Sequence, residues 1–234
     1  YRDHVIMGKD EWRDLFCGQL SFLPLSKRLS HLRRRVLTKM RPFIKEMRRQ
    51  EERKIAATGE EVNEKTIKAM ARLLAWRALR PLREELERAT ALDLLQLYRR
   101  LYEDPDPFRD TPDGIAPPAD WPAIRADTLA RLDRGEIPYE DMIPLLYLQG
   151  CLEGFPANGS IRHLIVDEAQ DYTALQFELF KRLFPGAFWT VLGDSEQTVH
   201  PGLSGKGFQA AADELDAGEA LTIRLSKSYR STGE

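Results

Sequence analysis

The fold class of the chain is indicated most clearly by eight residues, Leu164-Ile165-Val166-Asp167-Glu168-Ala169-Gln170-Asp171. Its apolar run, which begins at Ile161, predicts a buried strand that ends directly in two acids. Parallel α/β proteins place their ligands at the carboxyl ends of strands. In a nucleotide hydrolase, the first acid of such a pair holds Mg²⁺ and the second positions and deprotonates water. Taken alone, the pair is also compatible with the end of a surface strand.

The residues that follow predict a parallel strand–helix–strand unit. Residues 172–184 have the pattern of an amphipathic helix that begins with a capping box between Thr173 and Gln176. Its inward-facing residues are expected to be Leu175, Leu179 and Leu183. Apolar runs at 189–192 and 221–225 predict a second and a third strand. We therefore expect an α/β fold with a parallel sheet from residue 161 onward.

Both later strands lead into polar residues that suit nucleotide chemistry. The loop after 189–192 offers the carboxylate of Asp194 and the amide of Gln197. After 221–225 come Tyr229, whose ring can stack on a base, and Arg230, whose fixed charge can meet a phosphoryl group. Each segment alone is compatible with a surface loop. The three in this order favour a nucleotide site.

Together the segments resemble the second, third and fourth motifs of the UvrD/Rep class of superfamily 1 helicases. The resemblance implies part of a RecA-like P-loop NTPase sheet, with ATP and Mg²⁺ as cofactors. Asp167 would bind the metal and Glu168 would be the general base. Gln197 would sense the γ-phosphate and Arg230 would contact it. The remaining cofactor-binding residues are expected to be Tyr229, which would stack near the adenine, with Gln170 and Asp194.

The tract His163–Leu192 is most similar to the HelD-like branch of this class, whose members act on RNA polymerase. The implied activity is that of an ATP-dependent DNA helicase or translocase, which moves on DNA or remodels a complex such as RNA polymerase. Two features depart from the helicase pattern. Residues 198–202 lack the aromatic and Trp that stack on single-stranded bases, and no Gly-x-x-x-x-Gly-Lys-Ser/Thr loop occurs. In residues 202–207, Lys206 is followed by glycine rather than a hydroxyl.

Because the phosphate-binding loop is missing, we expect the chain to be a fragment of a longer helicase-type NTPase and to be inactive alone. Residues 1–103 are expected to form a helical insertion, an arm that makes the chain mostly α overall. Residues 104–122 are a Pro-rich connector, with short helices after it at about 122–134 and 139–152. Residues 123–234 would be a partial motor domain whose end can extend into the second motor domain.

The arm is expected to be an antiparallel helical hairpin, with an ordinary helical bundle as the alternative. Residues 25–49 carry an apolar stripe and should kink at Pro42. Residues 50–63 are predicted to form a polar tip, and residues 64–88 a second helix that kinks at Pro81. The apolar side of this second helix is predicted to hold Ile67, Met70, Leu74, Ala78, Leu82 and Leu86. Thr90 is expected to start a third helix, with Asp93 completing its capping box.

Charge is unevenly distributed along the chain, although the net charge is only −2. Residues 1–103 hold 24 Lys and Arg against 15 Asp and Glu, whereas the rest holds 11 against 22. A basic half can favour DNA or an acidic protein surface, and a solvated helix surface is the alternative. The arginines expected to meet a partner are Arg33, Arg34, Arg35, Arg48 and Arg49.

The compartment is expected to be cytoplasmic. No apolar run reaches the ~18 residues of a membrane span, and the first residues show no signal-peptide pattern. Cys17 and Cys151 are isolated, which favours neither a disulfide framework nor a zinc site. Two further functions stay open beside the motor: a non-catalytic binding module whose basic arm docks on RNA polymerase or DNA, and a degenerate α/β domain that binds no nucleotide.

Overall fold

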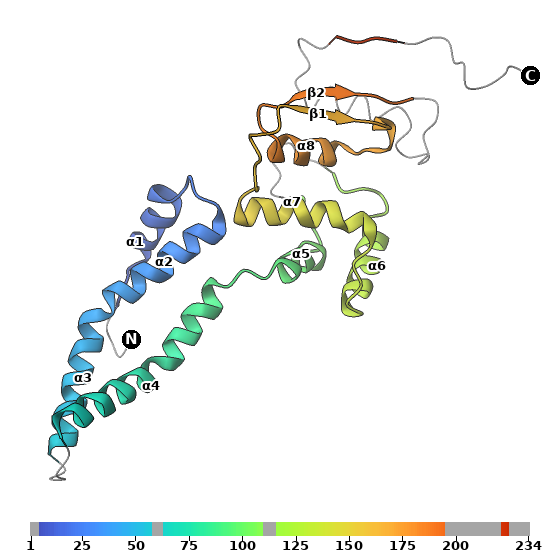
Figure 1. The fold of residues 1–234 in the computed structure, drawn as a ribbon. Coiled ribbons are helices and arrows are strands. Elements are labelled where there is room, and N and C mark those ends of the chain that lie inside the picture. The colour runs from blue at the N-terminus through green and yellow to red at the C-terminus, as the bar shows by residue number, and fades with distance from the viewer. Residues whose placement is uncertain (1–4, 58–62, 110–115, 195–220, 225–234) are drawn as a thin grey trace, which may run out of the picture. The chain divides into compact units, whose positions relative to one another are not determined.

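The computed structural model describes residues 5–57, 63–109, 116–194 and 221–224. The chain divides into two compact units, one formed by Tyr1–Tyr139 with Leu148–Gly154 and the other by Glu140–Tyr147 with Phe155–Glu234. The first unit is helical, and the second contains the sheet (Figure 1). Within the described residues, no helix combines the length and the apolar character that a membrane crossing requires.

The first unit begins with two short helical segments, α1 (Lys9–Arg13) and the π-helix η1 (Asp14–Gln19). The helix predicted at 25–49 is then divided into α2 (Leu25–Lys39) and α3 (Arg41–Ala56). The break falls at Met40, two residues before Pro42, which occupies the first turn of α3. Proline is tolerated there because the first-turn amides have no partner within the helix. The stripe is buried at Leu32 and Met40, whereas Phe43 is 40% exposed.

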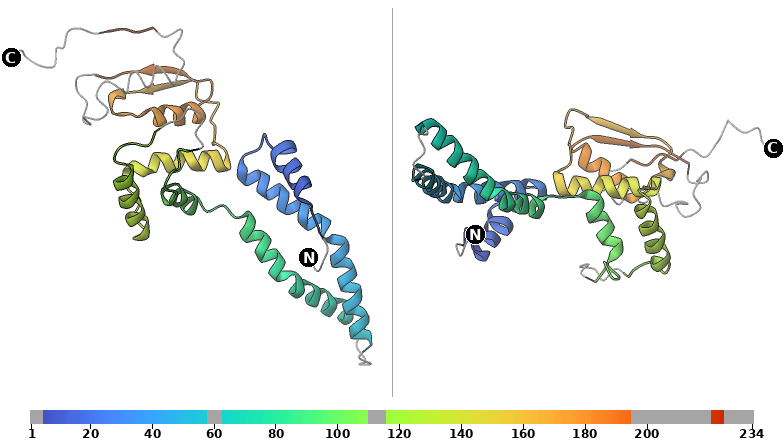
Figure 2. Two further views of the ribbon diagram at one scale, coloured as in Figure 1. Left: turned by 180° about the vertical axis from the view of Figure 1, so that it is seen from behind. Right: turned by 90° about the horizontal axis from the view of Figure 1, so that it is seen from below.

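Helices α3 and α4 (Glu64–Thr90) form the predicted antiparallel hairpin, and the two helices lie side by side in all views (Figures 1 and 2). The tip is shorter than predicted, because α3 continues to Ala56. Asn63 caps the start of α4 by accepting a hydrogen bond from the Thr66 amide at 2.8 Å. The helix continues through Pro81 without interruption.

The buried face of α4 differs from the predicted one in the middle of the helix, whereas the predicted Ile67, Leu82 and Leu86 are half-buried. Ala71, Ala75 and Leu79, spaced by four residues, are at most 4% exposed, whereas Met70 and Leu74 are 46% and 40% exposed. The prediction chose the bulkier side chains, which lie one residue earlier on the helix. Alanines instead allow two helix backbones to approach closely, so the packed face follows the small residues.

Thr90 ends α4 rather than starting the next helix, and its hydroxyl donates to the Leu86 carbonyl at 2.7 Å. The following helix is α5 (Leu94–Glu103), and Asp93 is its N-cap. The Asp93 carboxylate accepts a hydrogen bond from the Gln96 amide at 3.0 Å. The Thr90 prediction was therefore wrong. Asp93 is the capping residue because its backbone is extended, as a helix N-cap requires.

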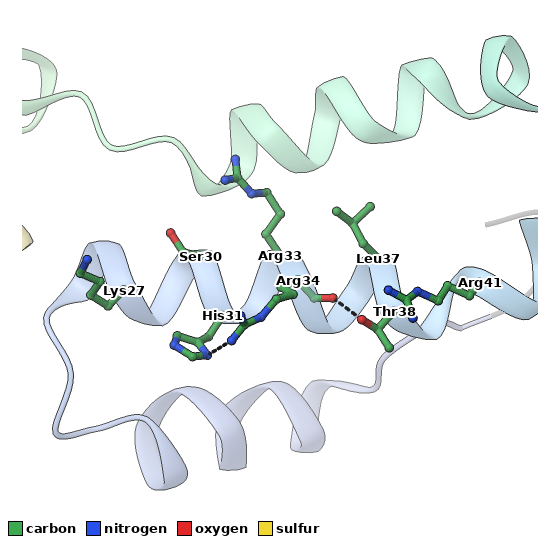
Figure 3. A pocket seen from close by; sticks show the side chains of 8 residues that line it. All are labelled: Lys27, Ser30, His31, Arg33, Arg34, Leu37, Thr38 and Arg41. Atoms are coloured by element: carbon green, nitrogen blue, oxygen red, sulfur yellow. Dashed lines mark hydrogen bonds between the residues drawn. The ribbon is translucent and has the colours of Figure 1, made fainter.

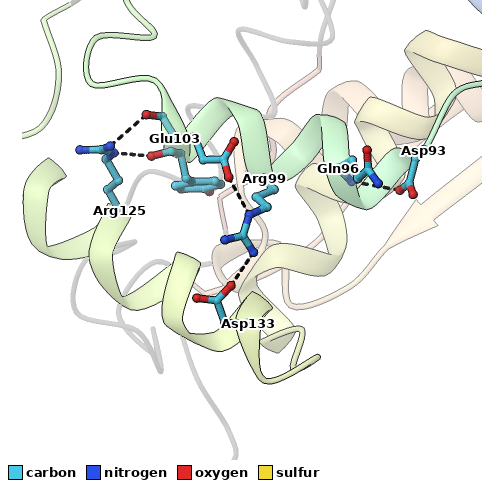
Figure 4. Close-up of polar contacts among 7 residues, drawn as sticks. Asp93, Gln96, Arg99, Glu103, Arg125 and Asp133 are labelled. Carbon is cyan, nitrogen blue, oxygen red and sulfur yellow. Dashed lines mark hydrogen bonds and ion pairs between the residues drawn. The ribbon is translucent and has the colours of Figure 1, made fainter. Parts of the chain in front are cut away.

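Helix α6 (Trp121–Asp133) packs against α5 after the Pro-rich connector. Arg99 of α5 pairs with Asp133 at 2.6 Å, and Arg125 of α6 donates to the carbonyl of Glu103 at 2.9 Å (Figure 4). Trp121 stacks on Tyr102 with ring centroids 5.5 Å apart. These contacts at the end of α5 hold both ends of the connector together.

The second unit contains a parallel strand–helix–strand motif, as predicted. Strands β1 (His163–Val166) and β2 (Phe188–Val191) pair in parallel, with His163 opposite Phe188 and Val166 opposite Val191. Helix α8 (Ala174–Leu183) lies between them in sequence and covers one face of the pair (Figures 1 and 2). The core of this strand–helix–strand motif is formed by Val166, Ala169 and Phe177. Helix α7 (Met142–Glu153), preceded by the short η2 (Tyr139–Asp141), has residues in both units.

The third predicted strand is not formed at Leu221–Arg224, the part of segment 221–225 that the structure describes. These residues have no regular secondary structure, and Leu221 and Ile223 are 86% and 74% exposed. Alternating apolar residues make a strand only where a neighbouring strand pairs with them, and within the described residues no strand pairs with Leu221–Arg224. Among described residues, the sheet therefore has two parallel strands.

Candidate functional site

The acid pair stands at the carboxyl end of β1, as the sequence predicts. Val166, the last residue of the strand, is 5% exposed, and Asp167 and Glu168 that follow it are both exposed. Their position leaves the carboxylates accessible to a ligand, while Val166 before them lies in the core. The predicted burial of the whole strand was wrong, because His163 is exposed and Ile165 is 65% exposed. The sequence produces this arrangement because its apolar run stops immediately before the first acid.

Glu168 has an unusual backbone conformation, with φ 50° and ψ 44° in the left-handed region. It is the one non-glycine residue with positive φ in the described part of the chain. Such a conformation costs on the order of 1–2 kcal/mol for a residue with a Cβ atom. The turn is held by local hydrogen bonds: the Glu168 amide donates to Asp167 Oδ1 at 2.9 Å, and the Asp171 amide donates to the Glu168 carbonyl at 3.0 Å.

Gln170 lies in the short 3₁₀ helix η3 (Ala169–Asp171) and is only 2% exposed. Its Nε2 donates to Glu168 Oε2 at 2.7 Å, and its Oε1 accepts from the Asp194 amide at 3.0 Å. The side chain therefore connects the acid pair after β1 with the loop after β2. The sequence predicts Gln170 as a cofactor-binding residue and contains no signal for its hydrogen bonds with Glu168 and Asp194.

Backbone hydrogen bonds hold the same two segments together. The Leu192 amide donates to the Val166 carbonyl at 2.8 Å, which extends the pairing beyond β2. The Ala169 amide donates in turn to the Leu192 carbonyl at 2.9 Å. Asp194 is thereby brought near the end of β1, so the structure gathers Asp167, Glu168, Gln170 and Asp194 at one edge of the sheet.

The start of helix α8 follows directly after the residues of the site and fixes their backbone. The predicted capping box is present: the Thr173 amide donates to Gln176 Oε1 at 2.7 Å, and the Gln176 amide donates to Thr173 Oγ1. This cap fixes the start of the helix directly after η3. One turn into α8, Phe177 is fully buried against Val166 and Ala169. Ala169, between the acid pair and Gln170, therefore packs in the same buried cluster as the Phe177 ring.

The remaining predicted site residues, Gln197, Tyr229 and Arg230, lie outside the described residues. Within the described residues, no three His, Cys, Asp or Glu side chains are grouped as a complete metal cage. Mg²⁺ does not need such a cage, because it usually binds one or two carboxylates together with waters and substrate phosphates. The exposed carboxylate of Asp167 suits that mode of binding.

A second feature is a basic groove of about 510 Å³ along α2 in the first unit (Figure 3). Most of its lining comes from one side of α2, and Arg41 begins α3. The lining contains no acidic residue and consists of Lys27, Ser30, His31, Arg33, Arg34, Leu37, Thr38 and Arg41. Arg34 Nη2 lies 2.9 Å from His31 Nδ1. Of the five arginines predicted to meet a partner, Arg33 and Arg34 line this groove, and Arg35 lines a smaller one beside it.

Comparison with known proteins identifies the family to which this chain belongs. Residues 30–201 match the model of the UvrD/REP helicase N-terminal domain, and the chain belongs to this family. It is also similar to ATP-dependent DNA helicase Rep of Escherichia coli (strain K12), with 33% identity over 101 residues. That similarity covers 42% of this chain and 15% of the length of Rep.

Proposed function

We propose that the full-length protein is an ATP-dependent superfamily 1 DNA helicase or translocase, and that this chain contributes part of its RecA-like motor domain. The observation that carries the proposal is the exposed acid pair at the carboxyl end of the parallel strand β1, in a chain of the UvrD/REP helicase family. In this function Asp167 binds Mg²⁺, which supplies charge neutralisation at the phosphates of ATP. Glu168 takes a proton from the attacking water.

The other residues complete the nucleotide site in this proposal. Gln197 senses the γ-phosphate, Arg230 contacts it and Tyr229 stacks near the adenine. Gln170 and Asp194 belong to the same site. The similarity of His163–Leu192 to the HelD-like branch supports a narrower function, in which ATP hydrolysis remodels a nucleoprotein complex such as RNA polymerase.

The test is the steady-state ATPase activity of the full-length protein and its Glu168→Gln variant. The variant keeps the size of the side chain but removes the base, so kcat should fall by about 10²–10⁴-fold. The KM for ATP should change little, because the loss is felt in the transition state. A folded Glu168→Gln variant with normal kcat would refute the motor function of the acid pair.

We propose as a second candidate a binding function for the basic arm, on DNA or on RNA polymerase. The observation that favours it is the groove on α2, whose lining contains Lys27, Arg33, Arg34 and Arg41 and no acidic residue. Phosphates of a nucleic acid would displace counterions there, and affinity would fall with a log–log salt slope near −0.9 per phosphate neutralised.

Charge reversal at Arg33 and Arg34 tests the arm, with Arg72→Glu plus Arg77→Glu on α4 as a control of equal charge that lies outside both grooves. DNA binding by the groove predicts a shallower salt slope for the first double variant and a much smaller change for the control. Equal losses in both would indicate a general effect of net charge. Unchanged DNA binding with weakened binding of RNA polymerase would assign the groove to the protein partner.

A further inference from the structure

Gln170 is one of two buried polar residues in the described part of the chain, and the other is Thr128. The direction of its amide is fixed by its two partners. The backbone nitrogen of Asp194 can only donate, so it must face Oε1. This leaves Nε2, which also can only donate, facing the Glu168 carboxylate. No rotated amide satisfies both partners.

This bond pair makes the position of Glu168 depend on the loop after β2. If the Asp194 backbone moves away from β1, Gln170 must either follow it or lose a hydrogen bond that water cannot easily replace at 2% exposure. If Gln170 follows, it releases Oε2 of Glu168. Glu168 itself is exposed, and its other carboxylate oxygen is left available at the surface.

We propose that Gln170 is a positioning residue, which holds the Glu168 carboxylate in place and couples it to the loop that follows β2. The inference rests on the proposed function, because the effect is felt through Glu168 as general base. A general base must lie within hydrogen-bond reach of the water it deprotonates, so a small displacement lowers turnover while nucleotide binding persists.

Three variants of the full-length protein test this role in steady-state ATPase assays. Gln170→Leu removes both hydrogen bonds. Gln170→Glu keeps an acceptor for the Asp194 amide but places a second carboxylate against Glu168. Gln176→Glu is the matched control, because Gln176 Oε1, like that of Gln170, accepts from a backbone amide, and glutamate is equally suitable in a capping box.

Both Gln170 variants should lower kcat by about 10–100-fold, with the KM for ATP within roughly threefold of the wild type. Gln176→Glu should stay within about twofold in kcat. Gln170→Glu separates positioning from support of the loop, because only the contact with Glu168 is destroyed. Normal kcat in Gln170→Glu would overturn the proposal.

Adding Gln170→Leu to Glu168→Gln supplies a readout that a merely structural role would not give. If Gln170 acts through Glu168, the double variant should have the same kcat as Glu168→Gln alone, within about twofold. A further tenfold loss, or loss of folded protein by circular dichroism, would overturn the proposal. A wild-type protein without ATP turnover, or an active Glu168→Gln variant, would instead refute the proposed function on which the inference rests.

Discussion

Removal of the Phe177 ring should destabilise the sheet-containing unit without disturbing the helical hairpin. Phe177 is 0% exposed and contacts Val166 and Ala169, so Phe177→Ala leaves a cavity at the centre of a small core. Substitutions of this kind cost about 3–5 kcal/mol. Because few buried residues surround the ring, we expect partial collapse and a cost near the lower limit, about 3 kcal/mol. That change multiplies the population of opened molecules by roughly 100-fold.

Hydrogen–deuterium exchange of the 234-residue chain resolves the effect by region. Amides of β1 and β2 should exchange roughly 100-fold faster in Phe177→Ala, while α4 serves as an internal reference and stays unchanged. Phe188→Ala is the matched control, because the same ring is 71% exposed at the start of β2. Its cost should stay below about 1 kcal/mol. Equal acceleration in both variants, or none in Phe177→Ala, would refute the packing argument.

Two other predictions concern the hairpin and the nucleotide site. Ala75→Leu should overpack the α3–α4 contact by about 1–3 kcal/mol and lower the melting temperature measured by circular dichroism, because Ala75 is 1% exposed. Ala78→Leu, exposed on the same helix, should be nearly neutral, and equal melting temperatures for the two would contradict the packing. In the full-length protein, Arg230→Ala should lower kcat for ATP more than it raises KM, whereas Tyr229→Ala should raise KM about tenfold. The reverse assignment in steady-state kinetics would contradict the proposed roles of these two residues.

The sequence predicted the elements around the acid pair well, because several local signals agree there. The apolar run before Asp167, the capping box at Thr173 and the amphipathic pattern of 174–183 all follow from chemistry within a few residues. The hairpin was also predictable, since two long helical patterns flank a polar segment. Helix boundaries were less well predicted. The kink predicted at Pro42 is a break between two helices at Met40, two residues earlier.

The contacts between elements could not be predicted in the same way. Hydrophobicity favours Met70 and Leu74 as the packed face of α4, but the buried residues are Ala71 and Ala75. The prediction of a third strand was wrong for a related reason. The alternation of apolar and polar side chains at 221–225 does not show whether another strand is available to pair with this segment. The link from Gln170 to Asp194 spans 24 positions, and neither residue has a local signal that points to the other.

The site combines exposed reacting groups with a buried connection, and this division has a physical reason. In the proposed function Asp167 and Glu168 meet a metal ion, water and phosphates. Their carboxylates then have to remain accessible and cannot be fixed by burial themselves. Their neighbours can be: Ala169 is fully buried, and Gln170 is anchored at both ends. Preorganisation of the acid pair therefore comes from residues that need not touch the nucleotide. Because the same buried amide also accepts a hydrogen bond from the Asp194 backbone, we expect a ligand that moves Asp194 to act on the position of Glu168 as well.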